Sequence, residues 1–120
     1  MNLPNSKYEE LPCLYVAVGT AYEKIYQTTF IKSIPDSVKI NGYMTLQNAN
    51  KFIRENLPVR KYQYYTKKER PLLKDLLIKN DEKCIICVYG HYIYVDGTDY
   101  WSFFNNMDDK VVAVWYLKGV

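Results

Sequence analysis

The sequence predicts an α+β domain in which helices come first and an antiparallel β-sheet follows. Before residue 80, apolar residues recur every three or four positions in three segments, which is the spacing of one helix face. After residue 82, apolar and aromatic residues run in short stretches divided by turn residues, which is typical of strands. The chain also contains 13 tyrosines, and aromatic residues favour strands.

A helix is expected to begin after Pro12, because proline suits the first turn of a helix. The run 14–18 could also form a strand, and Gly19 weakens a helix. The helical period nevertheless continues past strand length, so we favour the helix. The positions that carry the period are Leu14, Val18, Ala21, Ile25 and Thr29.

Two more helices are expected before the sheet. One covers about 46–56 with Thr45 as its cap, and the other runs from about Glu69 to Ile78 with Pro71 in its first turn. Residues 33–44 are interrupted by turn residues and predict a loop or a short strand. The predicted strands are 59–65, 83–89, 91–95, 100–105 and 110–117, and the last four are expected to form an antiparallel meander.

The length and composition of the chain predict how many domains it forms and in which compartment it is found. A chain of 120 residues with 48% hydrophobic and 24% charged residues is expected to form one folded domain, residues 1–120, with 1–10 as an N-terminal arm. The arm lacks the apolar stretch of a signal peptide, and no segment is long enough to span a membrane. We therefore expect no membrane partner. Three cysteines, an odd number, favour a reducing cytoplasm over a disulfide framework.

Three residues carry the candidate chemistry. Cys13 stands at the expected start of the first helix, where free N–H groups and the helix dipole favour a thiolate. His91 is the only histidine, and an imidazole beside the thiol could take its proton and return it to a leaving group. Asn105 ends the neighbouring predicted strand, where its amide could fix the imidazole tautomer.

The order of these residues and their local sequences resemble the papain-like cysteine peptidases. The stretch 91–97, His-Tyr-Ile-Tyr-Val-Asp-Gly, is followed by Tyr100-Trp101 and then by Asn105, which matches the Tyr-Trp-x-x-x-Asn run of that family. The compact layout is similar to the bacteriocin-processing peptidase domains of ABC exporters. The resemblance covers most of the chain from residue 12 onward, and the second half carries it best.

The resemblance implies a papain-like fold, with an N-terminal helix packed on an antiparallel sheet and two further helices. It also implies a thiol peptidase or related acyl-transfer enzyme acting on a peptide or protein. Cys13 would be the nucleophile, His91 the acid/base and Asn105 the orienting residue. That chemistry needs neither a metal nor an organic cofactor.

Two departures from the family pattern keep a second function open. Lys7 stands where the family usually has the glutamine of the oxyanion hole, and Pro12 and Leu14 replace the usual neighbours of the cysteine. Losing one oxyanion donor costs roughly 10²–10³ in rate. The alternative is therefore a catalytically inactive papain-like interaction module, for instance a viral protein that binds or inhibits a host factor.

Other patterns favour ordinary structural roles. Cys84 and Cys87 have metal-pair spacing, but residues three apart in a strand point to opposite faces and no second pair completes a zinc site. The acidic residues of the predicted turns are expected to be solvated, with Asp108 or Asp109 as a weaker alternative to Asn105. The segment 51–83 holds ten basic and five acidic residues with interleaved tyrosines, but a wet strand face has the same sequence, and no nucleic-acid partner is expected.

Overall fold

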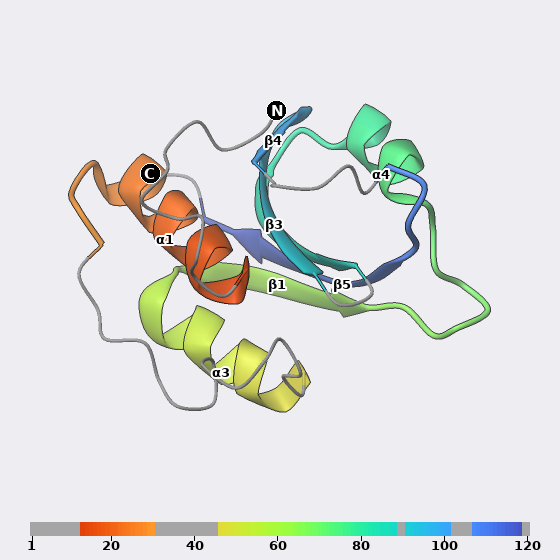
Figure 1. The fold of residues 1–120 in the computed structure, drawn as a ribbon, viewed down its shortest axis with the longest axis horizontal. Coiled ribbons are helices and arrows are strands. Elements are labelled where there is room, and N and C mark those ends of the chain that lie inside the picture. Colours follow the sequence, from red (N-terminus) through yellow and green to blue (C-terminus); the bar gives the residue numbers. More distant parts are fainter. Residues whose placement is uncertain (1–12, 31–45, 89–90, 102–106, 119–120) are drawn as a thin grey trace.

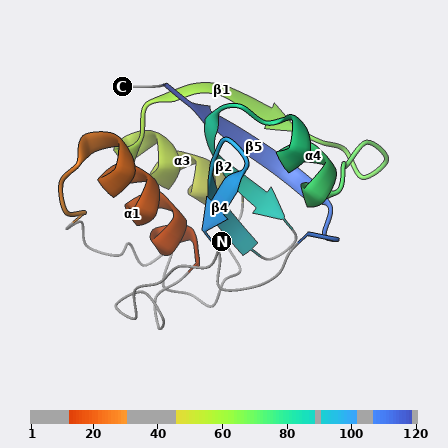
Figure 2. The same ribbon diagram turned by 90° about the horizontal axis from the view of Figure 1, so that it is seen from above.

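A computed structural model describes residues 13–30, 46–88, 91–101 and 107–118 of the chain. In these residues the α+β class is confirmed, with three helices and a five-stranded antiparallel sheet (Figure 1). Helices α1 (Cys13–Tyr26) and α3 (Leu46–Asn56) pack on one face of the sheet, and α4 (Leu73–Lys79) packs on the other (Figure 2). The sheet is therefore the middle layer of the described fold.

The strand order is β1-β5-β2-β3-β4. The expected meander holds for β2 (Lys83–Val88), β3 (His91–Asp96) and β4 (Asp99–Trp101), but it is wrong for β5 (Val111–Leu117), which returns to lie between β1 (Val59–Tyr64) and β2. The compositions explain this order. β5 is apolar on both faces and gains most from a central position, whereas β1 carries adjacent exposed charges that suit an edge.

Helix α1 confirms the predicted helix and excludes the alternative strand over 14–18, but it ends at Tyr26, so Thr29 lies beyond the helix and is exposed. Every residue from Leu14 to Ala21 is buried, because the sheet covers one side of the helix and aromatic rings cover another. Gly19 permits the second contact: a Cβ at this position would lie 3.1 Å from the Phe30 ring. The glycine that weakens the helix locally therefore lets an aromatic ring pack closely against it.

The ends of α4 differ from the sequence prediction. The helix begins at Leu73 rather than near Glu69, and Leu72 is extended and forms a bridge with Lys110. The Pro71 carbonyl accepts a hydrogen bond from the Val111 N–H at 2.8 Å, and the Leu73 N–H donates to the Asp109 carbonyl at 2.9 Å. Pairing with the chain that leads into β5 thus replaces the first helical turn.

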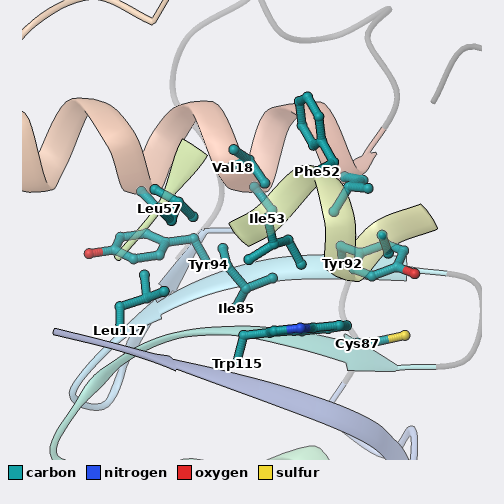
Figure 3. Packing of buried hydrophobic residues seen from close by; sticks show 14 of the residues in the cluster. Val18, Phe52, Ile53, Leu57, Ile85, Cys87, Tyr92, Tyr94, Trp115 and Leu117 are labelled. Carbon is teal, nitrogen blue, oxygen red and sulfur yellow. The ribbon is translucent and has the colours of Figure 1, made fainter. Parts of the chain in front are cut away.

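Two apolar clusters lie on the two faces of the sheet, and they divide the cysteine pair. Cys87 belongs to the cluster under α1 and α3, which Figure 3 shows. Cys84 belongs to the cluster under α4. The prediction that these cysteines face opposite ways is confirmed. The first cluster contains the large side chains Trp115 and Tyr92, and it supports the candidate site described below.

Several predictions concern parts of the chain outside the described residues. They are the arm over 1–10, the loop over 33–44, the cap at Thr45, and the positions of Lys7 and Asn105. Among the described residues, no helix is both long enough and apolar enough to cross a membrane.

Candidate functional site

Cys13 is the first residue of α1 and is half-buried. Three backbone N–H groups, those of Tyr92, Leu14 and Cys13 itself, lie near its sulfur and favour the thiolate form. Two of these belong to the first turn of the helix, whose N–H groups have no partner within the helix. The third comes from β3. The sulfur therefore lies in a small cradle of donors where α1 meets the sheet.

The register of the sheet shows in which direction the backbone N–H of Tyr92 points. Asp96 and Asp99 flank a two-residue turn in which Gly97 has a φ of 64°. From this turn, every second residue of β3 directs its backbone N–H and C=O toward the β4 side. These residues are Asp96, Tyr94 and Tyr92. The described pairing with β4 reaches only as far as Tyr94. The Tyr92 N–H thus points beyond the described end of β4, where the Cys13 sulfur accepts it.

Burial raises the pKa of the Cys13 thiol above its ordinary value, and the three N–H donors only partly oppose this. The effect of burial therefore outweighs the helix-start effect that the sequence predicts. A raised pKa means that the resting residue is a neutral thiol near pH 7.

The alkylation of Cys13 tests this protonation state. We expect its rate with iodoacetamide to be low at pH 7 and to rise with a midpoint above that of an ordinary cysteine, because only the thiolate reacts and burial raises the thiol pKa. Peptide mapping by mass spectrometry assigns the adduct to Cys13. A plateau reached below pH ~8 would show a thiolate stabilised by an ion pair instead.

His91 begins β3, directly before the tyrosine whose N–H contacts the sulfur. The structure thus brings the backbone of His91 beside Cys13. Strand alternation places Tyr92 on the α1 side and His91 on the other side of the strand, at its first residue. The side chain of His91 is thereby directed toward the α4 face of the sheet, on the side opposite to Cys13, and only the backbone at the start of β3 approaches the sulfur.

The third predicted member, Asn105, lies outside the described residues. The carboxylate of Asp108, one of its two weaker substitutes, lies 3.1 Å from the Lys74 ammonium. Among the described residues, no group of three or more His, Cys, Asp or Glu side chains could hold a metal ion.

Sequence reasoning missed Tyr92 and Cys87 as neighbours of the site. They face each other across β2 and β3, and the Tyr92 hydroxyl donates a hydrogen bond to the Cys87 sulfur (Figure 3). Burial raises the pKa of Cys87 to about 11, and this hydrogen bond opposes the rise. A signal was present in the sequence, because the alternation that excluded a metal pair also places Cys87 on the α1 face.

The basic segment 51–83 is largely engaged in contacts with its own surroundings. Arg60 pairs with Glu82, and the cations of Arg60 and Lys61 lie 5.8 and 5.6 Å from the centre of the Tyr116 ring. Lys83 pairs with Asp96. These contacts agree with the interpretation of this segment as a charged strand edge that faces the solvent.

The described residues thus form an α+β fold with a half-buried thiol where a helix start meets a strand start. No family model, curated protein or solved structure matches this chain.

Proposed function

We propose that the chain is a thiol peptidase or a related acyl-transfer enzyme that acts on a peptide or protein. The observation that carries the proposal is the position of Cys13, whose sulfur lies in a cradle of three N–H groups beside the start of the strand that His91 begins. Nucleophilic catalysis requires the His91 imidazole to reach this sulfur from the first residue of β3, at the end of the strand.

The raised pKa of Cys13 defines the order of events. The neutral thiol attacks the substrate carbonyl while His91 takes its proton, and the imidazolium then returns that proton to the leaving amine. The carbonyl oxygen becomes an oxyanion near the first turn of α1, where the Cys13 and Leu14 N–H groups can stabilise it. Asn105 would orient the imidazole, and no metal or organic cofactor takes part.

An activated ester tests the acyl-transfer step without knowledge of the natural substrate. With p-nitrophenyl acetate, the Cys13 sulfur bonds to the acetyl carbon, p-nitrophenolate leaves, and the thiol proton passes to His91. We expect a burst of one p-nitrophenolate per chain and an acetyl group on Cys13. His91→Ala should slow the burst by about 10²-fold or more, because general base catalysis supplies that factor.

The matched control is Cys84→Ala, which removes a buried thiol from the opposite face of the sheet and should keep the burst. An unchanged burst rate in His91→Ala would contradict the role of the imidazole. Acetylation of Cys87 in place of Cys13 would contradict the choice of nucleophile.

The second candidate is an inactive papain-like interaction module, for instance a viral protein that binds a host factor. The burial that raises the Cys13 pKa favours it, because an inactive module has no need of a reactive thiol. Its prediction differs from that of the enzyme: no burst occurs, and wild type and Cys13→Ala bind the same partner equally well.

We propose the cytoplasm as the compartment. The three cysteines are free, two of them are buried, and reduced thiols are the normal state of cysteines there.

A further inference from the structure

Asn50 organises a polar group on α3 that the proposed chemistry does not use. Its Oδ1 accepts two hydrogen bonds, one from the indole N–H of Trp115 at 2.9 Å and one from Arg54 Nε at 2.8 Å. Trp115 is fully buried, so its indole position is determined by the core. The buried tryptophan orients Asn50, and Asn50 in turn orients the exposed arginine.

Arg54 is consequently held by one edge of its guanidinium. The Nε–H is used, and no acidic group in the described part of the chain pairs with its two terminal amino groups. A guanidinium fixed in this way loses less conformational entropy on binding than a freely rotating one. Its remaining N–H donors form the planar fork that matches a carboxylate.

A continuous series of contacts connects this arginine with Cys13. The Trp115 ring lies 5.1 Å from the Tyr62 ring and 6.2 Å from the Tyr92 ring, measured between centroids. Tyr92 donates its N–H to the Cys13 sulfur. The positive charge of Arg54 opposes the burial that raises the pKa of Tyr62, as expected for a cation close to that hydroxyl. Arg54 and Cys13 are therefore connected through the aromatic side chains that the sheet buries on its α1 and α3 side.

We propose that Arg54 anchors a carboxylate of the substrate, so that the enzyme acts on peptides with an acidic residue at a fixed distance from the reacting carbonyl. This inference rests on the proposed function, because it needs the substrate to reach Cys13. The carboxylate supplies two acceptor oxygens, and the terminal amino groups of Arg54 supply the donors. Lys51, one turn earlier and exposed, adds positive charge to the same helix.

Bromoacetyl peptides test the inference without any need for turnover. The probes are bromoacetyl-oligoalanyl-glutamate amides and the matched glutamine compounds, with zero to about three alanines that each add ~3.5 Å of reach. The Cys13 sulfur bonds to the methylene carbon, bromide leaves, and the thiol proton goes to solvent. We expect the glutamate probe to label Cys13 about three- to tenfold faster than the glutamine probe at one spacing.

Variants of α3 assign this preference to Arg54. Arg54→Gln should remove it, Arg54→Lys should keep only part of it, and the matched control Lys51→Gln should keep most of it. Equal rates for the glutamate and glutamine probes at every spacing would overturn the inference, as would an unchanged preference in Arg54→Gln.

The same assay separates this inference from the proposed function. If iodoacetamide and all the peptide probes leave Cys13 unlabelled even at high pH, the sulfur is inaccessible and the proposed function itself fails. If iodoacetamide labels Cys13 and the peptide probes show no charge preference, only the role of Arg54 fails.

Discussion

Replacing Cys13 with alanine should abolish peptide hydrolysis and leave the fold intact. The substitution removes the proposed nucleophile, so the proposed function predicts a fall in turnover of ~10³-fold or more. The loss of packing should be small, because Cys13 is half-buried at the end of a helix and contacts the main cluster only from outside. A quenched fluorescent peptide mixture measures turnover, and urea unfolding measures stability.

Two companion variants sharpen this experiment. Cys13→Ser keeps a hydroxyl in the cradle of N–H groups but lacks the nucleophilicity of sulfur, so it should be nearly as inactive as Cys13→Ala. Cys84→Ala removes a fully buried thiol from the α4 face and should lose stability while it keeps turnover. Hydrolysis that persists in Cys13→Ala would remove the basis of the enzyme proposal.

The helices and strands could be predicted largely because local periodicity and burial agree. Helix α3 has the predicted bounds, and α1 follows its apolar period. The differences arise where hydrogen bonds between segments far apart in the sequence determine the local structure. Leu72 bonds to the residues before β5 instead of joining α4, and β5 takes a central place that its apolar composition favours, although its local sequence does not specify β1 and β2 as its neighbours. Pairing between strands far apart in sequence depends on which strand gains most from burial on both faces.

For the candidate site, the sequence predicted where Cys13 lies in the fold, but it did not predict the direction in which the pKa of its thiol shifts. The position of Cys13 at a helix start follows from Pro12 and the apolar period. Its raised pKa does not follow, because the sign depends on how deeply the sheet buries the sulfur. The contact with the Tyr92 N–H depends on how α1 lies against β3. Local sequence carries little information about such a contact, since it joins residues about eighty positions apart.

Replacing Trp115 with alanine should cause the largest loss of stability. Its side chain is fully buried, packs against Tyr62 and Tyr92, and donates its indole N–H to Asn50. Removing it leaves a large cavity under α3 and removes a donor from Asn50, so we expect a loss of about 3–5 kcal/mol in the free energy of unfolding. Since a domain of this size is stabilised by only about 5–15 kcal/mol, the variant should be close to unfolding at room temperature. Urea denaturation followed by circular dichroism measures the loss.

Trp115→Phe distinguishes the packing contribution from the hydrogen bond. Phenylalanine keeps most of the ring contacts and loses the N–H, so the expected cost is about 1–2 kcal/mol. Tyr64→Ala is the matched surface control, because Tyr64 lies on the edge strand β1 with 45% of its surface exposed and should change stability by less than about 0.5 kcal/mol. A loss in Trp115→Ala no larger than the loss in Tyr64→Ala would contradict the central place of Trp115 in the core. If Trp115→Phe also abolishes the glutamate preference of Cys13 labelling, the indole orients Arg54 through Asn50, as the two hydrogen bonds on Asn50 predict.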